Sequence, residues 1–114
     1  MNPIDEAMQT IDQLHGTGSA EGLAKLILTL YNAVHPFSIR ECFRSFDDTR
    51  TKLGLRMIDH FLTNGEDDSL LNAGQKIYDT WPSLVVLSNA GSNAKAEVLE
   101  KWRDEMLDDL PVEE

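Results

Sequence analysis

The chain has 114 residues, 41% of them hydrophobic and 26% charged, and a formal net charge of −10. This length fits one domain whose core can fold without disulfides or metals, and the single cysteine, Cys42, excludes an internal disulfide. The first residues carry acids where a signal peptide would carry positive charge, and every apolar run is too short to span a bilayer. We therefore expect a cytoplasmic protein.

The negative charge is concentrated in the second half of the chain. Residues 58–114 contain thirteen acids and four bases, whereas residues 1–57 contain seven acids and six bases. Such a field repels nucleic acids and anionic membranes and attracts basic protein surfaces, so we expect no direct contact with nucleic acid or membrane. The segment 40–56 is locally basic, with Arg40, Arg44, Arg50, Lys52 and Arg56.

Helical periodicity and capping residues divide the first half into three helices. Asn2-Pro3 starts the first helix, and Gly16 ends it. The second helix follows the glycine segment and runs to His35-Pro36. Its wide apolar arc predicts that it is the buried centre of the fold. A capping box that begins at Ser38 starts a short third helix through Phe46.

The second half contains two or three further helices. Asp47 or Asp48 caps a helix that Asn64-Gly65 closes, and a fifth helix runs from about residue 67 to residue 81. We expect their core-facing residues to be Leu53, Met57, Ile58, Phe61, Leu62, Leu70, Leu71, Ile77, Tyr78 and Trp81. Pro82 either breaks the fifth helix or starts another turn.

The end of the chain is harder to assign. Residues 83–88 are ambiguous between strand and helix, and helix is favoured because there is no second strand to pair with. The segment "SNAGSN", residues 88–93, reads as a loop before a last helix from about residue 94 to residue 110. Its apolar stripe, with Trp102 as a core residue, is expected to face inward and consists of Val98, Leu99, Trp102, Met106 and Leu110.

Together these patterns predict an all-α fold, a compact bundle of five to six helices. Residues 1–110 would form a single helical domain, and residues 111–114 a disordered acidic tail.

The glycine segment does not fit a nucleotide-binding loop. Gly16, Gly18 and Gly22 are spaced G-x-G-x-x-x-G, one residue longer than the dinucleotide motif, and they follow an acidic amphipathic helix instead of a strand. A P-loop lysine is also missing after Gly22. We interpret the segment as a tight link between helices, whose glycines permit positive φ and close approach.

Other reactive side chains form no recognisable catalytic or metal site. His15, His35 and His60 have no histidine or cysteine at zinc-ligand spacing, and each is expected near a helix end or on an exposed face. Cys42 occupies a staple position, which favours a small buried hydrophobe over a nucleophile. Residues 64–69, "NGEDDS", lack the ligand pattern of a calcium loop. We therefore predict no catalytic residue, metal or cofactor.

The acidic end of the chain is the candidate binding site. On a helix, several of its carboxylates project from one side about one turn apart, and a basic groove could accept them in place of phosphates. The alternative interpretation is a solvated helix face. The candidate partner-binding residues are Glu97, Glu100, Asp104, Glu105, Asp108 and Asp109.

Residues 14–82 resemble an uncharacterised family of small bacterial domains carried on conjugative elements and phages. The resemblance rests on Gly16-Thr17-Gly18-Ser19, Ala24, Leu28, Tyr31-Asn32, Phe37, Asp47 and Trp81-Pro82. It implies a mobile-element setting and no particular activity.

Two functional hypotheses follow. The first is a non-catalytic protein that docks its acidic face on a basic, nucleic-acid-binding surface of a host complex; by analogy of size, charge and setting it is similar to inhibitors of host defence such as anti-CRISPR proteins. The alternative is a self-associating structural or regulatory module, possible as a homodimer, for maintenance or transfer of a mobile element. A hydrolase that uses Cys42 or a histidine is the least favoured hypothesis.

Overall fold

The computed structural model describes residues 1–32, 35 and 37–109, with the backbone alone for residues 106–109. The regular secondary structure of these residues is entirely helical, which confirms the all-α prediction. The six helices are α1 (Pro3–Gln13), α2 (Gly18–Tyr31), α3 (Ile39–Phe43), α4 (Asp48–Asn64), α5 (Asp68–Thr80) and α6 (Pro82–Asp109). None of the described helices is both long enough and apolar enough to cross a membrane.

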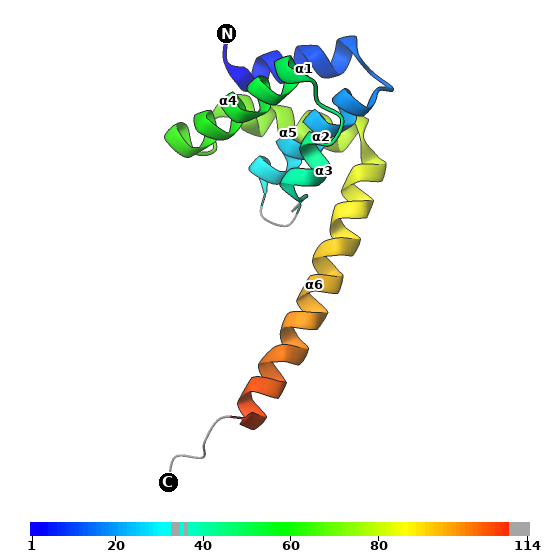
Figure 1. Ribbon diagram of the computed structural model, residues 1–114, viewed down its shortest axis with the longest axis vertical. Coiled ribbons are helices and arrows are strands. Elements are labelled where there is room, and N and C mark those ends of the chain that lie inside the picture. The colour runs from blue at the N-terminus through cyan, green and yellow to red at the C-terminus, as the bar shows by residue number, and fades with distance from the viewer. Residues whose placement is uncertain (33–34, 36, 110–114) are drawn as a thin grey trace.

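Helices α1 to α5 pack into a globule, and α6 extends away from it (Figure 1). The molecule is consequently elongated, measuring 62 Å along its longest axis and 29 and 26 Å along the other two.

Helix α2 is the centre of the globule, as predicted. Every residue from Gly22 to Leu28 is buried, and α2 packs against α1, α3, α4 and α5. A helix that is apolar almost all round is stable only when other elements surround it. The residues that meet it in the core include Ile4, Ile11, Met57, Leu70 and Ile77.

Side-chain caps set the starts of the first five helices. Each cap oxygen accepts a hydrogen bond from a backbone N–H of the first turn, which would otherwise lack a partner. The caps are Asn2, Thr17, Ser38, Asp47 and Asp67. The predicted starts of α1, α3, α4 and α5 are thereby confirmed, and α2 begins at Gly18, within the glycine segment.

The glycine segment is a structural link between α1 and α2, as interpreted from the sequence. Gly16 has a φ of 90°, a left-handed conformation that favours glycine. A Cβ atom at Gly22 would lie 2.3 Å from the carbonyl oxygen of Cys42. The missing side chain at Gly22 therefore allows the backbones of α2 and α3 to pack directly against each other.

Two residues of α4 and α5 that were expected in the core face solvent. Leu62 is 76% exposed and Leu71 is 42% exposed. Consecutive residues of a helix point about 100° apart. Only one of each neighbouring apolar pair therefore faces inward, namely the half-buried Phe61 and the buried Leu70.

The predicted loop at residues 88–93 is wrong, because α6 continues through it as one helix. Pro82 is tolerated in the first turn of α6, and residues 83–88 are helical. A loop would be needed only if the last helix turned back onto the core. It does not turn back, because every residue from 93 to 105 is exposed.

The predicted inward stripe of the last helix is therefore also wrong. Val98 and Leu99 are 47% and 46% exposed, and Trp102, expected in the core, is 59% exposed. The helical period alone does not reveal whether a partner for the apolar face lies within the same chain. The side chain of Met106, together with Leu110 and the tail 111–114, lies outside the described residues.

Candidate functional site

The acidic residues chosen from the sequence lie on the projecting part of α6. Glu97, Glu100, Asp104 and Glu105 are exposed, and none of them forms an ion pair with a described residue. The spacing of Glu97, Glu100 and Asp104 places them on one face of the helix, about one turn apart. The backbone of α6 includes Asp108 and Asp109, whose side chains are outside the described set.

Positively charged side chains lie on the globule, on and next to α3 and α4. Arg56 of α4 donates hydrogen bonds of 2.9 and 3.2 Å to the carboxylate of Glu6. These bonds hold the pKa of Glu6 below its ordinary value. Arg50 lies 3.5 Å from Asp47. The remaining bases of the segment are exposed and have no ion pair among the described residues; they are Arg40, Arg44 and Lys52. The charge of the molecule is therefore divided between a basic side of the globule and an acidic arm.

The sequence predicts His35 near the end of the second helix, and the structure places it in the segment that follows α2, with its side chain buried. Its side chain is 1% exposed. Its Nε2 atom bonds the hydroxyl of Tyr78 on α5, and its Nδ1 atom lies 2.6 Å from Oγ of Ser88 on α6. The Ser88 hydroxyl in turn donates to the carbonyl of Val85 at 2.9 Å.

These contacts form a chain of donors that suits a neutral imidazole. The Ser88 hydroxyl hydrogen is directed at the carbonyl of Val85, so the Ser88 oxygen accepts from His35 Nδ1–H, and His35 Nε2 accepts from the Tyr78 hydroxyl. Burial lowers the pKa of His35 and raises that of Tyr78, and both shifts favour the neutral forms.

The His35 chain joins α5 and α6 to the segment between α2 and α3. Ser88 is 4% exposed, so its hydroxyl has no access to a substrate. We assign these three side chains to holding the base of α6 on the globule.

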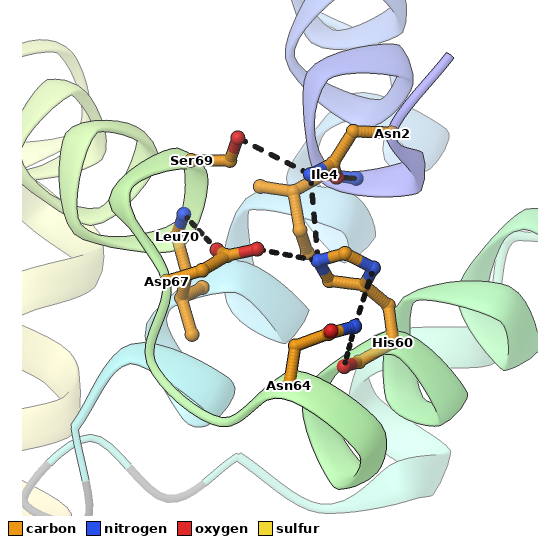
Figure 2. Close-up of polar contacts among 7 residues, drawn as sticks. All are labelled: Asn2, Ile4, His60, Asn64, Asp67, Ser69 and Leu70. Carbon is orange, nitrogen blue, oxygen red and sulfur yellow. Dashed lines mark hydrogen bonds and ion pairs between the residues drawn. The ribbon is translucent and has the colours of Figure 1, made fainter.

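A second polar cluster ties three helix ends together (Figure 2). Asp67 caps α5 through Leu70 N–H at 3.0 Å, and its other oxygen lies 2.6 Å from Nε2 of His60 on α4. The hydrogen bond from His60 is the main cause of the lowered pKa of Asp67. Asn2, the cap of α1, donates to Ser69 Oγ at 3.2 Å. The acidic segment 64–69 thus supplies the cap of α5 and the side chains that bond this helix start to α4 and α1.

The His60 cluster lacks the geometry of a catalytic pair. The amide nitrogen of Asn64 is 3.2 Å from His60 Nδ1, and that atom therefore accepts while Nε2 donates to Asp67. The nearby hydroxyl, that of Ser69, bonds Asn2 instead of the imidazole. Both ring nitrogens are consequently used in structural bonds.

Cys42 and His15 occupy the positions expected from the sequence. Cys42 is buried, and burial raises its pKa to about 11, which disfavours the thiolate that a nucleophile needs. The exposed ring of His15 lies 5.2 Å from the ring of Trp81. Among the described residues no group of three or more His, Cys, Asp or Glu side chains could hold a metal ion.

Sequence reasoning located the acidic residues but missed the polar cluster at the base of α6. His35, Tyr78 and Ser88 are separated by 43 and 10 residues along the chain, and no local pattern connects them. No protein-family model, curated relative or solved structure matches the chain at a significant level.

Proposed function

We propose that this protein is a non-catalytic binding module whose α6 docks on a basic surface of another protein. The observation that carries the proposal is the acidic line of Glu97, Glu100 and Asp104, which are exposed on α6, the helix that extends away from the globule (Figure 1). Residues 89–109 of α6 extend for about 31 Å at 1.5 Å per residue. An arm of this length can enter a groove that the globule itself could not.

A groove that binds nucleic acid is the partner surface that this arm fits best. Carboxylates about one turn apart offer a row of negative charge to lysine and arginine side chains that otherwise meet phosphates. The net charge of −10 would accelerate the approach to such a surface. The family resemblance of residues 14–82 implies that the protein is carried on a mobile element. An inhibitor of host defence encoded on such an element would use this mode of binding.

The polar clusters of the globule support a non-catalytic role. The imidazoles of His35 and His60 are used in bonds that hold helices together, and Cys42 is buried with a raised pKa.

The proposal is tested by reversing the acidic line. The variant Glu97→Lys/Glu100→Lys/Asp104→Lys changes side chains on the part of α6 that projects from the globule, so the globule should keep its stability. The control, Asp12→Lys/Asp59→Lys/Asp79→Lys, makes the same change in net charge with three acids exposed on the globule.

The protein is used to capture its partner from a host lysate, and the affinity of the identified complex is measured for both variants over a range of salt concentrations. We expect the α6 variant to lose about 2 kcal/mol or more, about thirtyfold in Kd, and the control to bind nearly as the parent does. Added salt should weaken the parental complex. Equal binding by the α6 variant and the parent, or a complex indifferent to salt, would show the proposal to be wrong.

A further inference from the structure

Helix α6 carries an exposed apolar strip that is separate from its acidic line. The strip consists of Leu87, Gly91, Ala94, Val98 and Trp102, spaced at i, i+4, i+7, i+11 and i+15. At 3.6 residues per turn its centre lies about a third of a turn around the helix from the acidic line. Leu87 is 56% exposed, Val98 47% and Trp102 59%. The strip is therefore open to solvent from the base of α6 to Trp102.

We infer that the strip binds a second copy of this chain, with the two α6 helices antiparallel. The inference does not depend on the proposed function, because the acidic line stays outside the contact between the two copies. A single exposed helix with tryptophan, leucine and valine in one row is a contiguous apolar surface that a soluble domain usually covers with a partner.

The distribution of charge along α6 supports an antiparallel pair. Residues 82–96 contain no acid and one base, Lys95, whereas residues 97–109 contain six acids and two bases. A parallel pair would place the six acids of one helix beside the six acids of the other. An antiparallel pair places each acidic half beside the acid-free half of the second copy, which removes that repulsion.

The sizes of the side chains support the same arrangement. The acid-free half of the strip contains Leu87 near the base of α6 and then the small Gly91 and Ala94, with Ala90 beside them, and the other half contains the large Val98 and Trp102. An antiparallel pair centred on residue 96 sets Val98 on Ala94 of the second copy and Trp102 on its Ala90 and Gly91. Large side chains then fill the space that small ones leave, as in packed cores.

The first experiment measures oligomeric state by light scattering. We expect twice the 12.8 kDa chain mass for the parent, and a mass that added salt leaves unchanged or increases, because the contact is apolar. The variant Val98→Ser/Trp102→Ser should have the mass of one chain and retain the helical circular dichroism of the globule. The control Leu62→Ser removes an exposed leucine that lies on α4 and should remain a dimer. A parent that stays a single chain at concentrations up to about 1 mM, the range of weak specific association, overturns the inference. A dimer that survives the double substitution overturns it as well.

The second experiment determines the orientation by disulfide trapping in a Cys42→Ala background. In the antiparallel pair, residue 101 of one copy lies level with residue 91 of the other, at the edge of the contact, so a mixture of Gly91→Cys and Lys101→Cys chains should form a mixed disulfide under mild oxidation. A Cβ at Gly91 meets no atom within 4 Å, so this substitution should not disturb the fold. Two residues 91 would be offset by about 15 Å along the helix, too far for a disulfide. Each variant alone should therefore stay uncrosslinked. Crosslinking of Gly91→Cys or Lys101→Cys chains with themselves, without the mixed product, would establish a parallel pair and overturn the inference.

Discussion

Acidification should destabilise the globule through the buried His35. The size of this loss of stability follows from the difference between the pKa of His35 in the folded chain and its pKa in the unfolded chain. The ordinary pKa of histidine, which the unfolded chain should show, is about 6.5, and burial lowers the pKa in the folded state. Between these two values the unfolded chain binds one more proton than the folded chain. The contribution of the neutral His35 to the free energy of unfolding is therefore fully present above pH 6.5 and is lost as the pH falls below that value.

The magnitude follows from linkage of one proton. Each pH unit below 6.5 costs up to about 1.4 kcal/mol until the folded pKa is reached. Lowering the pH from about 7.5 to about 5.5 should then remove up to about 1.4 kcal/mol from the free energy of unfolding. That loss corresponds to a fall of roughly 6–11 °C in Tm for a globule of this size.

The assay is urea unfolding followed by tryptophan fluorescence in a Trp102→Phe background. Trp81 is then the single tryptophan, so the signal reports on the globule and not on the projecting part of α6. The variant His35→Phe should be less stable at pH 7.5, because it leaves the Tyr78 hydroxyl without its acceptor, and it should lose most of the dependence on pH between 7.5 and 5.5. His15→Gln, which removes an exposed histidine, is the control and should keep the parental dependence. If His35→Phe and the parent show the same dependence on pH, the assignment of a neutral buried imidazole is wrong.

Three further predictions concern packing, capping and reactivity. Gly22→Ala should cost about 1–3 kcal/mol or more in urea unfolding, because its methyl group would meet a backbone oxygen at 2.3 Å, whereas Gly91→Ala should raise the helical content measured by circular dichroism. Asp67→Ala should cost about 1–2 kcal/mol of unfolding free energy through the lost cap, and Asp67→Ser should recover part of it without restoring the bond to His60; equal losses in the two variants would argue against the cap as the main contribution. Cys42, with a pKa of about 11, should have about one thiolate in a thousand molecules at pH 8. Mass spectrometry should therefore show very slow alkylation of the folded protein and fast alkylation in urea, and rapid labelling without urea would contradict the buried position.

The parts of the fold that local chemistry specifies could be predicted from the sequence. A cap such as Asn2 or Asp67 bonds the backbone two or three residues away, so its effect is visible in a short stretch of sequence. The burial of α2 was predictable because apolar residues surround the helix, which leaves no side suited to water. The link at Gly16 and Gly22 was likewise predictable from the spacing of the glycines and the helices around them.

Only the tertiary structure decided where α6 goes and what lies beneath it. The period of its apolar residues shows that one face of the helix avoids water. Burying that face is favourable whether the surface that packs on it belongs to this chain or to another, so the sequence pattern does not distinguish the two cases. Helix α6 has 28 residues. Its first turns pack on the globule through Leu84 and Ser88, and the remainder of the helix continues into solvent. The burial of His35 was not predictable for a related reason. The hydroxyls that bond its two ring nitrogens come from α5 and α6, and a polar ring can be buried only where such partners are present.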